Sequence, residues 1–257
     1  MKHFSIPVIA LSGPLGCGKT KVSSHLKHLY PDWLQLSYSD GFKQVLEFVY
    51  GFPVGMQSLQ SYKSSKQPQF GGDLSVRDIQ RHVANIGFRP LNELTWAHFT
   101  YQVIQAVQDP LNSWYDQFPV FRTYVDSLCA KQRVDSHKVQ GILIDDLRFE
   151  SDCNNLLEMG GRVVYIYREA AEKRFLDDVA KHHMRINRIG RAMKWPSAFS
   201  LDRSELEIIY VKSKSHASFS NHVNLDAASP NELGLVDFFW RQQIATARTD
   251  TDIRRIR

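Results

Sequence analysis

Apolar positions in the first fifty residues follow two different periods. Residues 7–12 form an unbroken apolar run, which is typical of a buried strand, and residues 33–38 alternate in part, which predicts a second strand. A helix-like run covers residues 21–28, and apolar residues recur at helical spacing over 42–49 until Gly51 ends the pattern. The N-terminal part is therefore predicted to form strand, helix, strand and helix in that order.

The middle of the chain shows helical periods and no clear strand. Residues 55–72 are rich in Ser, Gln and Lys, and we expect a mobile loop or a poorly packed insertion there. Ser75 with Asp78 three residues later resembles a capping box at a helix start. The predicted helices cover residues 75–87, 92–108 and 121–130.

Strands and helices alternate again in the second half. Two apolar strands are predicted at 141–144 and 162–167, each followed by a helical pattern, and a last strand is predicted at 220–225. This alternation indicates an α/β fold with a mainly parallel sheet flanked by helices. Ligands in such folds bind at the carboxyl ends of the strands. The predicted helices of this half cover residues 149–159, 170–183 and 230–247.

Composition narrows the class without identifying a function. The 257 residues are 43% hydrophobic, enough for a sizeable core, and the net charge of +5 suits an anionic substrate as well as nucleic acid. Cys17, Cys129 and Cys153 have no spacing for a disulfide framework or a metal, and the ten histidines have no metal spacing. With no signal peptide and no membrane span in sight, we expect a cytoplasmic protein in a reducing compartment.

The strongest motif is Gly13-Pro14-Leu15-Gly16-Cys17-Gly18-Lys19-Thr20, which follows the first strand and opens the first helix. This is the G-x-x-x-x-G-K-[ST] pattern of a phosphate-binding loop. Its glycines let successive backbone N–H groups face one phosphate chain, and the helix dipole adds to the attraction. Lys19 supplies a charge for the β- and γ-phosphates, and Thr20 supplies a hydroxyl ligand for Mg²⁺. The alternative, an ordinary Gly-rich turn, is disfavoured by the flanking strand and helix.

Acidic and basic residues follow the strand at 141–144. Asp145 and Asp146 are placed to order Mg²⁺ directly or through water, although a strand-end turn or a helix cap would also favour aspartate. Arg148 comes next, and beside a phosphate loop it is a candidate phosphate ligand. We therefore expect these residues and the loop to share one site.

A second basic cluster lies in the region 182–203. Arg185, Arg188 and Arg191 recur every three residues, so they would share one side of a helix. Arginines on a closing lid would stabilise the charge of a transferred phosphoryl group, whereas a solvated helix face is the plain alternative.

The helical region between the strands offers candidates for a second anionic ligand. Arg77 lies one turn into its predicted helix, and surface solubility would explain it equally well. Phe42 and Trp96 could stack on a base, although aromatic residues at helical spacing are more often core.

Several stretches together resemble phage-type deoxynucleoside monophosphate kinases, a family of P-loop nucleoside monophosphate kinases. The resemblance covers most of the chain, and its parts occur in the family's order. They are Ser39-Asp40-Gly41-Phe42-Lys43, similar to "FADPLK"; Val76-Arg77-Asp78-Ile79-Gln80 with Gly87, similar to the "R-x-x-x-Q-x-x-G" helix; Asp146-Leu147-Arg148-Phe149, similar to "DVRF"; Ser204-Glu205; and Asn224-Leu225.

The resemblance implies roles for individual residues. Lys19 and Thr20 would serve ATP·Mg²⁺, and the arginines of 185–191 would form the lid. Asp40 and Lys43 would border the acceptor site, and Arg77 and Arg148 would hold the acceptor phosphate. We expect Phe42, Gln80 and Trp96 to belong to the acceptor site as well. The implied reaction is direct in-line transfer of a phosphoryl group from ATP to a (deoxy)nucleoside 5′-monophosphate, with Mg²⁺ as cofactor.

The domain organisation expected from these motifs is a kinase core with insertions. It comprises a core at 1–50 and 132–247, a helical acceptor-binding insertion at 51–131, a lid at 184–204 and a basic tail at 248–257. No stable nucleic-acid partner and no membrane are expected, and a homodimer is left open. The alternatives are a P-loop kinase of another small phosphorylated acceptor, such as phosphomevalonate or dephospho-coenzyme A, and a P-loop ATPase or switch acting on a partner.

Overall fold

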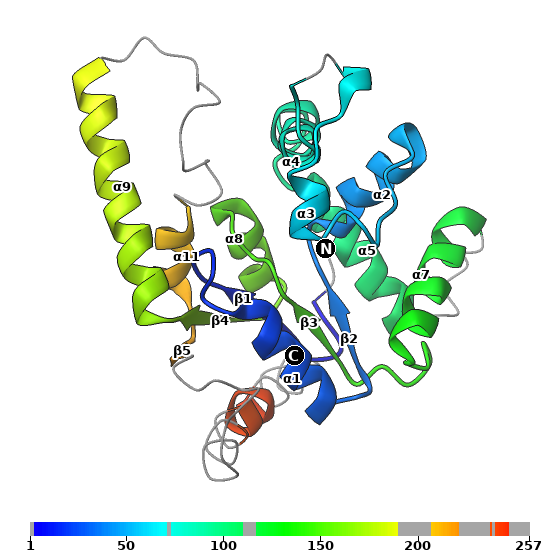
Figure 1. Cartoon of the computed structure of the whole chain (residues 1–257). Helices are drawn as coiled ribbons and strands as arrows, with labels where there is room; N and C mark the ends of the chain where they lie inside the picture. The colour runs from blue at the N-terminus through cyan, green and yellow to red at the C-terminus, as the bar shows by residue number, and fades with distance from the viewer. Residues whose placement is uncertain are drawn as a thin grey trace. The chain divides into compact units, whose positions relative to one another are not determined.

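The computed structural model divides the chain into two compact units (Figure 1). The first comprises residues 1–35 and 106–257, and the second comprises residues 36–105. The sequence-based assignment sets its boundaries elsewhere, at 50/51 and 131/132. The residues that the structure describes are 3–70, 73–109, 117–189, 207–220, 237 and 240–246.

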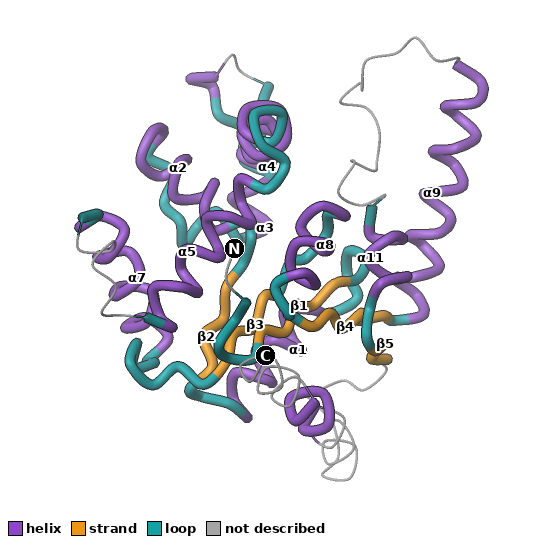
Figure 2. The backbone as a smooth tube through the Cα atoms, turned by 180° about the vertical axis from the view of Figure 1, so that it is seen from behind, coloured by secondary structure: helices purple, strands orange, loops and turns teal. Residues whose placement is uncertain are grey.

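A five-stranded sheet forms the centre of the first unit (Figure 2). The strand order is β2-β3-β1-β4-β5, and β1 is parallel to both of its neighbours, as β4 is to β5. The predicted α/β class is thereby confirmed. The last strand begins earlier than the predicted 220–225, and only Ser220 of that range is described. The strands are β1 Val8–Ser12, β2 Trp33–Leu36, β3 Gly141–Ile144, β4 Arg162–Tyr167 and β5 Ala217–Ser220.

Helices cover both faces of this sheet because alternate strand residues point to opposite sides. Ile9 and Leu11 pack with Leu26 of α1 and with Trp240 of the helical stretch 240–246. On the other side, Tyr165 packs with residues of α9 and α11. Views from opposite sides agree, with α1 in front in Figure 1 and α8 and α11 in front in Figure 2. These helices are α1 Lys19–Leu29, α7 Pro119–Gln132, α8 Glu150–Glu158, α9 Glu169–Ile189 and α11 Ile208–Lys214.

The second unit is helical, as the sequence predicts. Ser75 caps its helix through a full capping box with Asp78, and the helix continues into a π-helical stretch that ends at Phe88, one residue past the predicted Gly87. The elements are α2 Asp40–Tyr50, α3 Gln60–Lys63, the short 3-10 helix η1 Pro68–Phe70, α4 Val76–Arg81, the π-helix η2 His82–Phe88 and α5 Thr95–Gln108, whose end lies in the first unit.

The expectation of a loose stretch at 55–72 is wrong for its described residues. Gln57 is fully buried, and its side-chain amide donates to the carbonyl oxygens of Lys43 and Phe52 at 2.9 and 2.7 Å. Tyr62 and Phe70 pack against the apolar cluster of this unit. A polar composition concealed a buried hydrogen-bonding residue and two anchoring rings, so the stretch is ordered by tertiary contacts that no local pattern shows.

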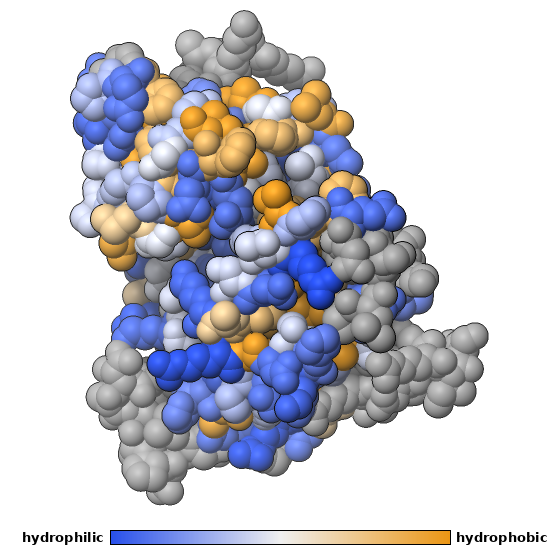
Figure 3. All heavy atoms as spheres, turned by 90° about the vertical axis from the view of Figure 1, so that its right-hand side faces the viewer, coloured by the Kyte–Doolittle hydropathy of each residue, from blue (hydrophilic) through white to orange (hydrophobic). Residues whose placement is uncertain are grey.

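Among the described residues, most of the large apolar side chains that are exposed belong to the second unit. Phe48 is 92% exposed and Leu91 is 83% exposed. Figure 3 shows hydrophobic side chains gathered toward the top of one face of the molecule. A small unit has a high ratio of surface to volume, so part of its apolar surface stays outside the core.

Gly141, the first residue of β3, is a test of packing within the sheet. A Cβ there would lie 2.4 Å from the Trp33 indole. We expect Gly141→Ala to lower the free energy of unfolding by about 1–3 kcal/mol, because overpacking forces the indole to shift. Gly55→Ala is the control, since a Cβ at Gly55 meets nothing within 4 Å. Denaturant titration of both variants decides, and equal midpoints would contradict the packing account.

Candidate functional site

The loop between β1 and α1 has the backbone of a phosphate-binding turn. Gly13, Gly16 and Gly18 have φ values of 141°, 81° and 93°, a region that residues with a Cβ rarely adopt. Gly18 precedes the first residue of α1 and is left-handed. The three glycines turn the chain sharply between strand and helix, so the loop ends at the positive end of the helix dipole.

The loop is pressed against the end of β4. A Cβ at Gly13 would lie 2.1 Å from the carbonyl oxygen of Ile166 and 2.9 Å from Cys17 Sγ. Cys17 is fully buried, which explains why a variable position of the motif holds a small apolar-like side chain. The course of the loop is therefore fixed by the sheet on one side and by its own buried thiol on the other.

Lys19 folds back onto the loop. Its Nζ donates to the carbonyl oxygens of Gly13 and Pro14 at 2.5 and 3.1 Å, and it lies 3.6 Å from Cys17 Sγ. An ammonium carries three donor hydrogens and no acceptor, so these contacts hold its charge directly over the loop.

Electrostatics connects Lys19 with the residues that follow β3. Burial lowers the pKa of the Lys19 ammonium; Cys17 counteracts that effect, Arg148 adds to the lowering, and Asp146 opposes it. These interactions place Asp146 and Arg148 within electrostatic reach of the loop lysine. The structure thus brings together three of the residues that the sequence assigned to one site.

The predicted metal ligands occupy the same end of the sheet. The backbone N–H of Leu147 donates to the carbonyl oxygen of Leu11 at 3.1 Å, which keeps the chain after β3 beside the end of β1. Thr20 is exposed, and Asp145 and Asp146 are half-buried. A hydroxyl and two carboxylates are hard oxygen donors, which fit Mg²⁺. Among the described residues no group of three or more His, Cys, Asp or Glu side chains forms a metal site, and Mg²⁺ bound together with phosphates needs only one or two carboxylates.

Arg174 lies beside the loop, and it was not among the candidates from the sequence. Its Nη2 lies 3.2 Å from the point where a Gly16 Cβ would be, and its side chain is exposed. Nε of Arg174 donates to the carbonyl oxygen of Ala170 at 3.2 Å, which steadies the guanidinium beside the loop. The signal in the sequence that could have identified Arg174 is its place in the first turns of the helix that follows the strand at 162–167.

Two of the three arginines predicted to form a lid lie in a helix that the structure describes. Arg185 and Arg188 lie within α9, which is longer than predicted. Arg191 lies outside the described residues. Their assignment to a lid stays a prediction.

In the second unit, polar residues gather at the start of α2 and on α4. Asp40 accepts from the Ser37 backbone N–H at 2.9 Å and lies 3.4 Å from Lys43 Nζ, so this carboxylate orients the lysine. Arg77 is held by one contact, from its Nη2 to Gln60 Oε1 at 2.8 Å. A neutral amide partner leaves the charge of that guanidinium uncompensated by the bond.

Packing accounts for Trp96 and Gln80. Trp96 is 5% exposed, and its indole N–H donates to the carbonyl oxygen of Ala84 at 3.1 Å. Its ring packs edge-on against the half-buried Phe42, with the ring centroids 5.7 Å apart. Gln80 is 7% exposed and donates to the carbonyl oxygen and side chain of Gln57 at 3.2 and 3.3 Å. Both residues belong to the core of the second unit, which is the alternative that the sequence left open for the aromatic residues.

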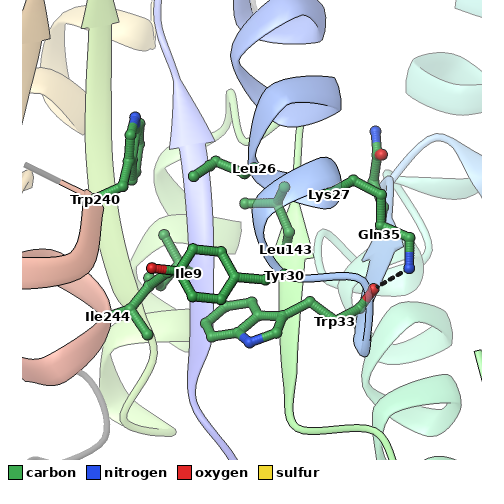
Figure 4. Close-up of a pocket in the computed structure, with 9 residues that line it drawn as sticks. All are labelled: Ile9, Leu26, Lys27, Tyr30, Trp33, Gln35, Leu143, Trp240 and Ile244. Carbon is green, nitrogen blue, oxygen red and sulfur yellow. Dashed lines mark hydrogen bonds between the residues drawn. The ribbon is translucent and has the colours of Figure 1, made fainter. Parts of the chain in front are cut away.

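A small cavity lies away from the loop (Figure 4). Its volume of about 10 Å³ is room for one water molecule, not for a nucleotide. At the edge of the cavity, Lys27 Nζ donates a hydrogen bond to the carbonyl oxygen of Trp33 at 2.6 Å. The lining residues are Ile9, Leu26, Lys27, Tyr30, Trp33, Gln35, Leu143, Trp240 and Ile244. This cavity is a packing feature of the first unit.

In the part of the chain that the structure describes, no helix combines the length and the apolar character that crossing a membrane requires.

Comparison with known proteins gives distant likenesses in structure. No family model matches the chain, and no curated protein does. Shikimate kinase from Bacteroides thetaiotaomicron is 11% identical, covering 93% of this chain and 99% of that chain with a TM-score of 0.34. A protein from Chloroflexus aurantiacus J-10-fl named "putative kinase" is 13% identical, covering 92% and 98% with a TM-score of 0.36. At these identities and TM-scores, the similarities do not indicate a function for this chain. The proposed function is therefore derived from the geometry of the site.

Arg174 gives a test of the site that needs no knowledge of the reaction. We expect Arg174→Ala to weaken ATP binding roughly tenfold, because a cation beside the loop is lost. Lys173→Ala is the matched control, since it removes an exposed positive charge from the neighbouring position. Calorimetric titration of both variants with ATP measures the difference. Equal losses in the two variants would indicate a general charge effect and remove Arg174 from the site.

Proposed function

We propose that this chain is a P-loop kinase that transfers the γ-phosphoryl group of ATP to a (deoxy)nucleoside 5′-monophosphate. The observation that carries the proposal is the grouping of Lys19, Asp146, Arg148 and Arg174 around a glycine-rich turn at the start of α1. Such a turn binds polyphosphate, and a carboxylate with several cations is the set that phosphoryl transfer requires.

The donor side follows from the loop. Backbone N–H groups of the turn would receive the β-phosphate, and Lys19 would exchange its loop carbonyls for phosphate oxygens. That exchange is favourable because the buried ammonium, whose pKa is lowered by burial, gains a full counter-charge. Arg174 would contact the same phosphate chain from α9.

Transfer is proposed to be direct and in-line. A phosphate oxygen of the acceptor is already an anion, so the chain needs no general base, and positioning with charge neutralisation supplies most of the rate. Thr20, Asp145 and Asp146 would hold Mg²⁺, which would neutralise part of the phosphate charge. Arg148 would stabilise the charge on the transferred group.

The acceptor side is assigned to the second unit on the strength of the family resemblance. Lys43, oriented by Asp40, and Arg77 would hold the acceptor phosphate. Arginine offers two parallel donors to a phosphate and so fixes its orientation as well as its charge. Because Trp96 and Gln80 lie in the core, base recognition is proposed to use other side chains than these two.

The decisive experiment is ATP consumption with each common (deoxy)nucleoside monophosphate, with a control that lacks an acceptor. We expect ADP and a nucleoside diphosphate to appear together in equal amounts. Equal ATP consumption with and without an acceptor, with no nucleoside diphosphate formed from the acceptor, would favour an ATPase. Turnover only with phosphomevalonate or dephospho-coenzyme A would keep the kinase chemistry and replace the acceptor.

Arg77 separates the acceptor role from the donor role. We expect Arg77→Ala to raise the KM for the monophosphate and lower kcat, with the KM for ATP little changed. Loss of one charged hydrogen bond should cost about 1.5–3 kcal/mol, or roughly ten- to a hundredfold in kcat/KM. Steady-state kinetics with each substrate varied in turn measure both constants.

Arg81, one turn further along the same helix, provides the control for this prediction. Arg81→Ala should leave the monophosphate KM close to that of the unchanged protein. If both variants lose activity equally, the positive charge of α4 acts only in a general way. The acceptor phosphate is then not bound by Arg77.

A further inference from the structure

A chain of hydrogen bonds links two of the proposed metal ligands through a residue that no motif identifies. Gln35 of β2 donates from Nε2 to Asp145 Oδ2 at 2.8 Å and to Ser23 Oγ at 2.7 Å. Ser23 in turn donates from Oγ to the carbonyl oxygen of Thr20 at 3.4 Å. Asp145 after β3 is thereby connected to Thr20 in the first turn of α1.

Chemistry fixes the direction of every bond in this chain. An ionised carboxylate only accepts hydrogen bonds, so the amide nitrogen of Gln35, not its oxygen, must face Asp145. The second amide hydrogen goes to Ser23, whose own hydroxyl hydrogen remains for the Thr20 carbonyl. Turning the amide over would set an oxygen against the carboxylate, so the arrangement has one stable orientation.

The backbone of Gln35 is itself clamped. Its N–H donates to Gln132 Oε1 at 2.9 Å, and its carbonyl oxygen accepts from Gln132 Nε2 at 2.6 Å. β2 is an edge strand, and the Gln132 side chain from α7 makes the two bonds that a further strand would make there. Gln35 therefore has little freedom in either its backbone or its side chain.

The hydrogen-bonded residues are buried to different degrees, and Gln35 itself is half-buried. Ser23 is fully buried, whereas Asp145 is half-buried and Thr20 is exposed. Buried hydrogen bonds that are fully matched hold their partners rigidly. The connection ends at the Asp145 carboxylate and at the backbone carbonyl oxygen of Thr20, the residue whose hydroxyl is the other proposed ligand. It is therefore suited to setting the positions of both residues.

We propose that Gln35 is a positioning residue that holds Asp145 and Thr20 in register for Mg²⁺; this rests on the proposed function. Mg²⁺ demands near-octahedral geometry, so small changes in ligand orientation weaken it strongly. Residues that hydrogen-bond metal ligands typically contribute ten- to a hundredfold to metal affinity. Gln35 does not touch the metal or the substrates, and it acts only through its two partners.

The test measures metal binding separately from activity. Gln35→Met keeps the length of the side chain and removes the amide. We expect Gln35→Met to weaken the affinity of the ATP-bound protein for Mn²⁺ roughly ten- to a hundredfold. Electron paramagnetic resonance measures this affinity. ATP affinity in the presence of EDTA should stay the same. Asp145→Asn should weaken Mn²⁺ affinity by a similar factor. The double variant Gln35→Met/Asp145→Asn should bind Mn²⁺ little more weakly than either single variant, because both changes remove the same interaction.

Gln243→Met is the matched control for loss of stability. Gln243 accepts a hydrogen bond from Arg162 Nε at 3.2 Å, at the start of β4 and away from the loop. The same substitution there should lower the melting temperature without changing Mn²⁺ affinity. A purely structural role for Gln35 predicts that the two variants behave alike.

Ser23→Ala keeps the proposal testable if Gln35→Met does not fold. It leaves the bond between Gln35 and Asp145 but cuts the link to Thr20, so we expect a smaller loss of Mn²⁺ affinity. Unchanged Mn²⁺ affinity in a folded Gln35→Met protein, or in Ser23→Ala when Gln35→Met does not fold, overturns the proposal. If the unchanged protein binds Mn²⁺·ATP but phosphorylates no monophosphate, the proposed function is wrong. The role of Gln35 is then decided by the Mn²⁺ affinities of the variants alone.

Discussion

The loop passes so close to the end of β4 that no side chain fits at Gly13. A Cβ there would lie 2.1 Å from the carbonyl oxygen of Ile166. This approach fixes the loop against the sheet, and it has a second effect through chain order. Because α9 begins just after β4 ends, the same contact brings the first turns of α9, with Arg174, to the loop. One steric constraint thus sets both the phosphate-binding turn and a cation beside it.

Charge at the site is arranged for a polyanion. Lys19, Arg148 and Arg174 are positive, and Asp146 is the acidic group that acts on Lys19. Burial and the neighbouring arginine both lower the pKa of Lys19, so the free protein holds a cation at some cost. A bound triphosphate would remove that cost. Under the proposed function, this crowding of positive charges in the free protein would contribute to the affinity for the phosphate chain of ATP.

Local patterns in the sequence predicted the parts of the structure that depend on neighbours in the chain. Unbroken apolar runs located β1, β3 and β4, and glycine spacing located the loop. Residues whose surroundings come from distant segments were missed. Gln35 meets a carboxylate 110 positions away, and Gln57 looked like part of a polar loop yet is buried. Spacing alone also could not tell that Arg174 would lie at Gly16, since that depends on the order of strands in the sheet.

The two adjacent aspartates have different surroundings in the structure. From the sequence, both Asp145 and Asp146 are candidates for ordering Mg²⁺. In the structure Asp145 Oδ2 accepts from Gln35 and is tied to α1, whereas Asp146 acts on the charge of Lys19. Successive residues after a strand point in different directions, so a pair of acids addresses two neighbours at once. The two carboxylates therefore have different neighbours, one in a hydrogen bond with β2 and the other in electrostatic interaction with the loop lysine.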